Sequence, residues 1–547
     1  MTYWAQPQTP RDQLLIPHAL DDLIPADHPV RQLEAILSQI DWRPWEARYN
    51  GHRGQPPIHP RLVAGAILYG LIRRIRSSRE LEEATRERLD FRWFLEGRTI
   101  DHSTFAEFRT AFEKELKDLH RGISRALVER ACGPGVLELI VDGTRIRANS
   151  DRNGARTAEA LEKRIAECAA ELDKKLAELG ERDRREDAEN QEIQALREKV
   201  ARLEVEKETY ARALEEARRR DAIKKSKEGK NAPAVRVPVT DPEATVLPNK
   251  EGGFAPNYTP VVAVESQSGA IVSDDVVEGN DEAGAVKKAV RECREVLGEA
   301  PARVLADQNF ASGENLDYLE QEKIEPYMPT GTDFRESNPA NRPDPTQAVV
   351  LKRWPDLPRT GTQLNPNAFV YDPQRDCYHC PMGKPLVFVG VGRWKRSGVA
   401  FRRYACSGKQ GCPLAEACVK GKTPWRTIQR DIYQDVRDRT GRRMASAEGR
   451  VIYSRRAPWV EGVVGTIKSA LGIRQFLLRG QRKVRMEWRW ITTAFNLKKL
   501  LKRGSKTPPP RAPWQKRCRE GFCAATRFFR AAIGDLGVPQ CLNSIHR

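Results

Sequence analysis

The stretch VLELIVDGTRIRANS, residues 136–150, decides how the fold of this chain is interpreted. Its first six residues, 136–141, form a mostly apolar run of strand length, which predicts a buried β-strand. Asp142 ends that run. Open α/β sheets place their chemistry at the carboxyl ends of strands, although an aspartate there can equally start a turn or cap a helix. Asp142 is therefore a candidate catalytic carboxylate.

Two further acids stand at notable positions. Asp307 follows the mostly apolar run at residues 302–306, so it also ends a predicted strand. Glu461 is a lone acid among lysines and arginines, in a segment whose apolar spacing predicts an amphipathic helix. By itself Glu461 could make ordinary ion pairs on a solvated basic helix. Three such carboxylates together can hold two divalent cations, as phosphoryl transfer requires.

The basic segment around Glu461 has an ordered pattern. Tyr453, Arg456, Glu461 and Lys468 are spaced as Tyr-x2-Arg…Glu-x6-Lys. With this pattern, the chain resembles the DDE-type transposases of bacterial insertion sequences. Other segments that fit, in order, are Ile24-Pro25, His59-Pro60, Asp101-His102-Ser103, Asp142-Gly143, Ala306-Asp307, Arg479-Gly480 and Glu487. The resemblance covers most of residues 12–500.

The resemblance implies an enzyme that cuts DNA at the terminal inverted repeats of its own element and joins the ends to target DNA. Asp142, Asp307 and Glu461 would hold two Mg²⁺ (or Mn²⁺) ions. The residues expected to contact DNA are Tyr453, Arg456, Lys468, Arg474 and Arg479. Each of these could instead form an ion pair on a helix surface or pack at the edge of a core.

The chain departs from the family pattern beside two of the acids. Asn309-Phe310 stands where Gly-Tyr is usual after the second aspartate. Gly462 and Val464 stand where Pro and Phe are usual after the glutamate. These changes affect packing around the acids and leave the acids themselves in place.

Two other functions are compatible with the sequence. One is a decayed or repurposed copy that still binds element ends without catalysis. The other is a ribonuclease H-like nuclease that cuts DNA without joining it. The intact acid triad argues against decay, whereas Gly462 and Val464 argue weakly for it.

The elements expected in the catalytic region follow the order of the ribonuclease H-like α/β fold. They are a strand ending at Asp142, a hairpin at residues 258–277, a helix at 282–297, a strand ending at Asp307, a helix at 313–322 and a strand at 324–328. In that fold the first and fourth strands are adjacent. The fold would therefore bring Asp142 and Asp307 together.

Bulk composition agrees with a DNA-binding protein. The chain has 547 residues and a net charge of +19, which implies a polyanionic partner, most simply DNA. No apolar run has the length of a membrane span, and the N-terminus lacks the features of a signal peptide. We expect a cytoplasmic, nucleoid-associated protein that forms a homodimer or a higher oligomer and does not bind membranes.

The chain divides into three expected domains. Residues 1–132 are predicted to form a helical transposase or DNA-binding domain, in which arginines between short helices fit a helix-turn-helix-like module or a dimerisation domain. Leu81 marks one of its helices, and Ser103 opens another in the manner of a cap. Residues 133–500 would form the catalytic domain. The basic tail, residues 501–547, either contacts DNA or has no function.

The first of two expected insertions in the catalytic domain lies at residues 156–230. Two apolar stripes with heptad spacing, divided at residues 180–186, predict an antiparallel helical hairpin resembling a coiled coil. A basic, glycine-containing segment at residues 224–230 would lead back to the sheet. The hairpin could mediate dimerisation, touch DNA or serve only as a spacer.

The second expected insertion is a cysteine-rich segment at residues 330–445. Five cysteines lie between Cys377 and Cys418, which favours metal binding over disulfides. The residues expected to hold a structural Zn²⁺ are Cys380, Cys406, Cys412 and Cys418. His379 could replace one thiol, and a set of free thiols in a loop-rich insert is the alternative.

Overall fold

The structure is a computed structural model. It describes residues 20–49, 56–131, 137–183, 190–229, 231–248, 252–279, 282–394, 397–408, 410–419 and 423–504. The chain divides into two compact units: residues 1–130 with 489–547, and residues 131–488. The expectation of a mixed α/β protein with a helical N-terminal region is confirmed.

The first unit is helical. Its helices are α1 (Pro29–Leu37), α2 (Arg43–Glu46), α3 (Pro60–Ile72), α4 (Ser78–Glu87), α5 (Leu89–Phe94), α6 (His102–Ala111), α7 (Glu113–Ala131) and most of α16 (Gln481–Gly504). Ser77 and Glu80 form a capping box at α4. The cap of α6 is Asp101, not Ser103, because the Asp101 carboxylate accepts the backbone N–H groups of Ser103 and Thr104. No described helix is long and apolar enough to cross a membrane.

The second unit is built on a seven-stranded sheet. Its strands are β1 (Glu138–Gly143), β2 (Ile146–Arg147), β5 (Thr245–Pro248), β6 (Phe254–Glu265), β7 (Ile271–Val277), β8 (Arg303–Leu305) and β9 (Glu325–Tyr327). Strand β6 is antiparallel to β1, whereas β1, β8 and β9 are parallel. Ile140 pairs with Leu305, which confirms that the strands preceding Asp142 and Asp307 are neighbours.

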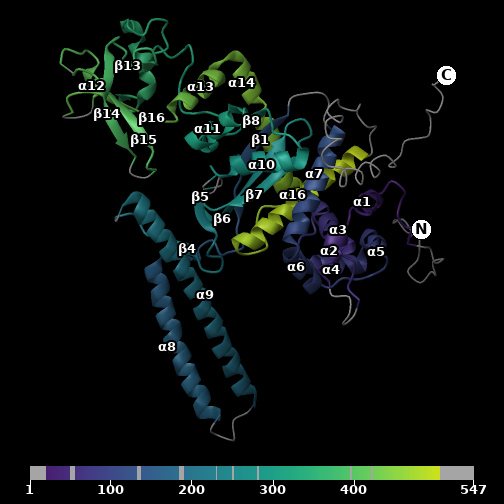
Figure 1. Ribbon diagram of the computed structural model, residues 1–547. Coiled ribbons are helices and arrows are strands. Elements are labelled where there is room, and N and C mark those ends of the chain that lie inside the picture. Colours follow the sequence, from purple (N-terminus) through teal and green to yellow (C-terminus); the bar gives the residue numbers. More distant parts are fainter. Residues whose placement is uncertain are drawn as a thin grey trace, which may run out of the picture. The chain divides into compact units, whose positions relative to one another are not determined.

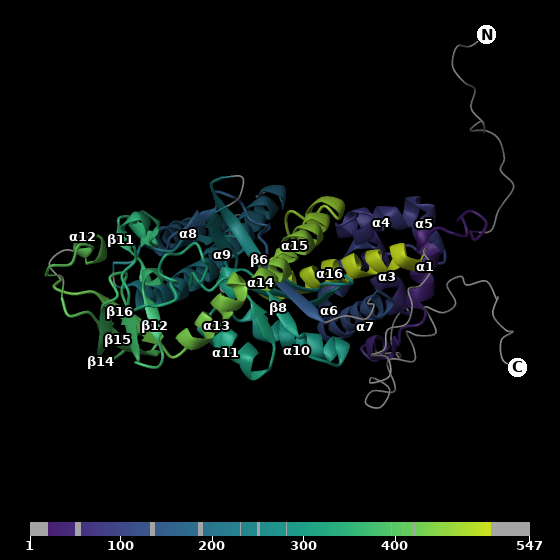
Figure 2. The ribbon, with the colours of Figure 1, turned by 90° about the horizontal axis from the view of Figure 1, so that it is seen from above.

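Helices pack on both faces of this sheet (Figure 2). On one face, Ser273 of β7 donates a hydrogen bond to Glu292 of α10 (Ala285–Leu297). On the other face, Ile140 and Leu305 pack against Val460 of α15 (Arg456–Gly465). The remaining helical elements of this region are η1 (Gln308–Phe310), α11 (Gly313–Gln321), α13 (Gln434–Ala445), α14 (Ala447–Ser454) and the π-helix η4 (Thr466–Ala470).

The segment between β2 and β5 contains two long helices, α8 (Ala158–Asp183) and α9 (Asn190–Glu228), which run side by side (Figure 1). Strands β3 (Ala155–Arg156) and β4 (Val237–Pro238) pair at their base. Both helices extend further than the sequence indicated. Helix α8 continues through Gly180, because one glycine costs only about 1 kcal/mol in a helix. Helix α9 continues to Glu228 and ends before Gly229, which has a positive φ of 97°.

The cysteine-rich insertion has a small core of its own and is not mainly loop. Its strands are β10 (Arg359–Thr360), β11 (Gln363–Leu364), β12 (Val370–Asp372), β13 (Cys377–His379), β14 (Pro385–Arg393), β15 (Ala400–Ala405) and β16 (Thr427–Asp431). Strands β12 to β16 form a five-stranded sheet in chain order, drawn in green in Figure 1. The short helical elements η2 (Leu351–Asp356), η3 (Pro366–Ala368) and α12 (Ala415–Cys418) complete it.

The expected C-terminal tail, residues 501–547, has only its first residues in the described part of the chain. Residues 501–504 continue α16. Residues 505–547 lie outside the described residues, so the expectation for the tail stays a prediction.

Candidate active site

The two aspartates that the sequence singled out lie side by side. Each comes two residues after a member of the Ile140–Leu305 pair, on neighbouring parallel strands. Side chains alternate along a strand, so Asp142 points to the same face as Ile140, where α15 packs. Asp307 caps the turn η1 and accepts the backbone N–H of Asn309 at 2.9 Å. The sheet therefore presents two carboxylates together at one edge.

Arg456, in the first turn of α15, is the cation that faces both carboxylates. Its Nη2 donates to Asp142 Oδ1 at 2.5 Å and lies 3.9 Å from Asp307 Oδ2. Tyr453 is half-buried beside it and interacts electrostatically with Arg456 and both aspartates. The Nε of Arg456 is buried without a hydrogen-bond partner among the described residues. One donor of the arginine is therefore buried beside the acids without a hydrogen bond to any described residue.

Burial makes the negative charge of Asp142 costly. It raises the pKa of this carboxyl, and the nearby charge of Asp307 raises it further, while Arg456 acts in the opposite direction. The net direction is upward, so one guanidinium does not fully compensate for the paired acids. A site with this surplus of buried negative charge suits an additional cation.

Glu282 is a third acid at this edge, and the sequence pattern did not single it out. It lies just before α10, and its side chain reaches so close to Gly143 that a Cβ there would collide with it. Asn309 Nδ2 lies 3.5 Å from its Oε2. Burial raises the pKa of Glu282, and the charges of Asp307 and Asp142 raise it further. The only available signal was its place before the helix that follows the hairpin, and many structural glutamates share that position.

Glu461, the third predicted acid, does not contact the two aspartates. It follows Val460, which anchors α15 on the sheet, and successive helix residues point about 100° apart. The Glu461 side chain is exposed and forms no hydrogen bond or ion pair with any described residue. The helix that carries it is nevertheless fixed against the strands that carry the aspartates.

The remaining predicted DNA-contacting residues lie further along the same segment. Lys468 is in the π-helix η4, a form of helix that often occurs at functional sites. Arg474 is exposed, and its backbone carbonyl accepts the N–H of Arg147 in β2. Arg479 is also exposed, and its Nε donates to the backbone carbonyl of Asn149 at 2.8 Å. The segment following α15 is therefore attached to the chain just beyond Asp142.

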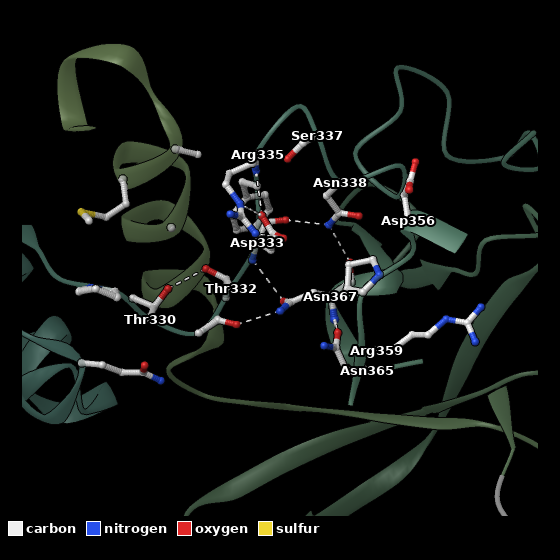
Figure 3. A pocket seen from close by; sticks show the side chains of 18 residues that line it. Thr330, Thr332, Asp333, Arg335, Ser337, Asn338, Asp356, Arg359, Asn365 and Asn367 are labelled. Atoms are coloured by element: carbon white, nitrogen blue, oxygen red, sulfur yellow. Dashed lines mark hydrogen bonds and ion pairs between the residues drawn. The ribbon is translucent and has the colours of Figure 1, made fainter. Parts of the chain in front are cut away.

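A polar cleft of about 560 Å³ begins at Gln308, the residue after Asp307 (Figure 3). Residues from the loop after β9, from the cysteine-rich insertion and from α13 line it. Most of its amides are already used: Asn338 donates to two backbone carbonyls, and Asn367 donates to that of Gly331. Arg359 and Ser337 are among the groups that border it. The cleft is thus a preformed polar surface that includes the residue following Asp307.

The four cysteines expected to bind zinc pack against the core of the insertion. Cys380 Sγ accepts backbone N–H groups of Met382 and Lys384, and Cys406 Sγ accepts that of Arg426 at 3.3 Å. The pKa of Cys418 is raised to about 11, mainly by burial; Arg426 acts in the opposite direction, and Cys406, Cys380 and Cys412 add to the increase. The four cysteines, all among the described residues, therefore lie in one part of the insertion, although no three of them have sulfur atoms that are all within 4.8 Å of one another. We refer to them below as the thiol group.

Comparison with known families gives two matches. Residues 379–501 match the family model described as a transposase DDE domain. Residues 18–111 match the model described as a transposase domain (DUF772). No curated protein matches the chain. The first match includes Glu461 and the basic segment around it, and the second covers the helices from α1 to α6.

Proposed function

Because the chain is a DDE-type transposase of the insertion-sequence type, we propose that it cuts DNA at the ends of its own element and joins them to target DNA. Enzymes of this family act on DNA by strand cleavage and transfer and generally use divalent metal ions. The observation that carries the proposal is the placement of Asp142 and Asp307 on adjacent strands, facing Arg456.

The carboxylates fit Mg²⁺ or Mn²⁺. Carboxylate oxygens are the ligands these ions prefer, and Asp142 and Asp307 carry more buried negative charge than Arg456 neutralises. Asp142, Asp307 and Glu461 would hold two ions, with Glu282 next to them. Such ions supply charge stabilisation to the attacking and leaving oxygens of a phosphodiester.

The basic residues position DNA. Arg456, which faces both aspartates, would donate to a phosphate oxygen if a metal ion neutralised them. Tyr453 would contact the cleaved end, and Lys468, Arg474 and Arg479 would hold neighbouring phosphates. Glu461 lies on the same helix as Arg456, one residue after Val460, which packs against both strands that precede the aspartates. The polar cleft at Gln308 would accept a DNA strand that leaves the site.

The arrangement of strands supports a ribonuclease H-like assignment for the seven-stranded sheet. In this proposal residues 1–132 form the N-terminal DNA-binding domain and residues 133–500 the catalytic domain. The insertions at 156–230 and 330–445 and the tail at 501–547 are accessory. The thiol group of the second insertion would hold a structural Zn²⁺, because it brings four cysteines together against one small core. Neither family match favours a decayed copy.

The test uses labelled DNA carrying the inverted repeats that flank the gene. Asp142→Asn, Asp307→Asn and Glu461→Gln should each lower Mg²⁺-dependent cleavage and strand transfer by about a thousandfold or more, because each removes a charge from the metal site. Binding in a gel-shift assay should remain. Glu314→Gln is the control, because Glu314 is an exposed acid in the first turn of α11. Near-normal cleavage by any variant of the three acids would remove that residue from the site.

A further inference from the structure

The hairpin of β12 and β13 places three metal-binding side chains on one face. Asp372 and Cys377 are directly opposite each other in the antiparallel pair, so their side chains share a face. His379 lies two residues after Cys377 and therefore points the same way. Among the described residues, these three are the only group of three or more His, Cys, Asp or Glu whose ligand atoms all lie within 4.8 Å of one another.

The distances within this group are compatible with ligands that share one ion. His379 Nε2 lies 3.6 Å from Cys377 Sγ and 3.5 Å from Asp372 Oδ2. The second distance exceeds the usual hydrogen-bond range of about 2.7–3.2 Å. Ligand atoms held about 2.0–2.3 Å from one tetrahedral ion lie about 3.3–3.7 Å from each other. The two separations from His379 Nε2 lie in this range, and the atoms of Cys377 and Asp372 are within 4.8 Å of each other.

The surroundings hold the three ligands in position. The opposite ring nitrogen of His379, Nδ1, lies 3.4 Å from the carbonyl oxygen of Gly383, an outer contact that typically orients a metal-bound histidine. Asp372 Oδ1 accepts the backbone N–H groups of Gln374 and Arg375, which leaves Oδ2 directed at the histidine. The side chain of His379 is 3 % exposed and Cys377 is 5 % exposed.

We propose that Asp372, Cys377 and His379 form a zinc site that is separate from the thiol group. A thiolate, an imidazole and a carboxylate together favour Zn²⁺ over Mg²⁺ or Ca²⁺. The fourth position is open to water or another small ligand. The ion would fasten the turn between β12 and β13, whose formation puts all three ligands in place.

Two observations separate this site from the thiol group. The charged neighbours of Cys377 are Asp372, Arg375 and Asp376, and none is a cysteine. The neighbours of Cys418, in contrast, include the other three members of the thiol group. An Asp–His ion pair that staples the hairpin without metal is the competing interpretation.

The experiment is zinc analysis of the full-length protein after removal of metal and reloading with Zn²⁺. Cys377→Ser and His379→Gln should each lower the zinc content by about one ion per chain. The control Cys293→Ser, which alters a buried cysteine of α10, should leave it unchanged. Asp372→Asn should weaken zinc binding, because the amide keeps the shape and removes the charge. Circular dichroism of each variant checks folding.

The test does not depend on the proposed DNA chemistry or on zinc in the thiol group. It compares only the zinc content of each variant with that of the wild type. If Cys377→Ser or His379→Gln retains the wild-type zinc content, the proposal is overturned. Cys412→Ser, in the thiol group, tests whether the two sites are separate. The zinc lost in Cys377→Ser and in Cys412→Ser should add in the double variant if the thiol group also binds zinc. If both single variants lose the same ion, there is one site and the proposal is wrong.

Discussion

At the level of single residues, Arg456 is the cation that lies against both aspartates. Its guanidinium bonds to Asp142 and approaches Asp307, so it occupies the position where another cation would compete for the same oxygens. Arginine stays charged at all relevant pH values, and it can exchange carboxylate for phosphate without loss of hydrogen-bond geometry. One side chain can therefore satisfy the acids in the free protein and the DNA backbone in the complex.

Glu282 provides the first prediction at this scale. Glu282→Gln should weaken Mn²⁺ binding and slow cleavage, because the amide keeps the contact with Asn309 but removes a charge beside Asp142 and Asp307. Titration calorimetry with Mn²⁺ measures the affinity without relying on activity. The control is Glu278→Gln, because Glu278 is 60 % exposed and pairs with Arg219. Unchanged Mn²⁺ affinity would show that Glu282 has only a structural role.

Asp142 provides a stability prediction with a defined pH dependence. Its pKa is raised in the folded chain, so the folded state holds this proton to higher pH than the unfolded state. Its contribution to stability is therefore greatest below the unfolded pKa of about 3.9 and is lost as pH rises through the folded value. Asp142→Asn should raise Tm at pH 7 without metal, and the gain should shrink toward pH 4.

The measurement for Asp142→Asn is a thermal melt in chelator at several pH values. Each kcal/mol of relieved burial cost would correspond to about 2–4 °C in Tm. Excess Mg²⁺ should reduce the difference, because only the wild-type carboxylate gains a full ligand interaction. A lower Tm of the variant at pH 7 would mean that the bond with Arg456 outweighs burial.

The sequence predicts the position of some site residues and not of others. Asp142 and Asp307 each follow a short apolar run, and strand pairing then brings them together without further information. Glu282 and Arg456 reach the same place from segments distant in the chain, and no spacing rule connects those segments. Asp372, Cys377 and His379 come together only because of the register of one hairpin. Local pattern predicts a strand end, whereas side-chain convergence depends on tertiary packing.

At the level of elements, the inserted helices α8 and α9 leave and re-enter the second unit at one point. Ala155 pairs with Pro238, so the ends of the insertion are held together by a short antiparallel pair. Arg220 of α9 donates to the backbone carbonyls of Glu243 and Ala244. Arg219 of α9 also pairs with Glu278, which follows β7. The insertion therefore contacts the sheet region at few points, and its own helices pack together through residues such as Leu172, Val200 and Leu203.

Replacement of residues 160–233 with a short Gly/Ser linker should therefore leave the seven-stranded sheet folded. The expected cost is the loss of the Arg220 hydrogen bonds, about 1 kcal/mol each, or a few degrees in Tm. Circular dichroism and a thermal melt are the measurements. Arg220→Ala in the full chain is the matched comparison and should reproduce much of the decrease. Complete unfolding of the shortened chain would make the helices part of the core.

Heptad patterns predicted α8 and α9 well, because the spacing of apolar residues along a long helix is enough to indicate which face packs. Glu461 shows that such patterns do not predict the direction of a particular side chain. Its helix was predicted from Val463 and Ile467, and both are buried as that spacing requires. The direction of the Glu461 side chain depends on how α15 sits on Ile140 and Leu305, which involves segments more than 150 residues away.

For the whole molecule, net charge is the property that acts on a binding partner over the longest distance. A net charge of +19 attracts any nucleic acid, so composition predicts DNA binding but not the sequence that is bound. Affinity from phosphate contacts falls steeply with salt because counterions are released from DNA. Substitution of a residue that contacts phosphate should therefore change how DNA affinity depends on salt. Substitution of an acid in the catalytic site should instead change the rate of cleavage.

Arg474 tests this separation. Arg474→Gln removes an exposed cation from the segment after α15, and it should lower the slope of log affinity against log salt by about one. Lys323→Gln is the matched control, because Lys323 is an exposed cation before β9, at the end of the sheet opposite Asp307. Asp307→Asn should keep the wild-type slope while losing cleavage. Filter binding at several salt concentrations measures all three. Equal slopes for Arg474→Gln and the wild type would place the DNA path elsewhere on the chain.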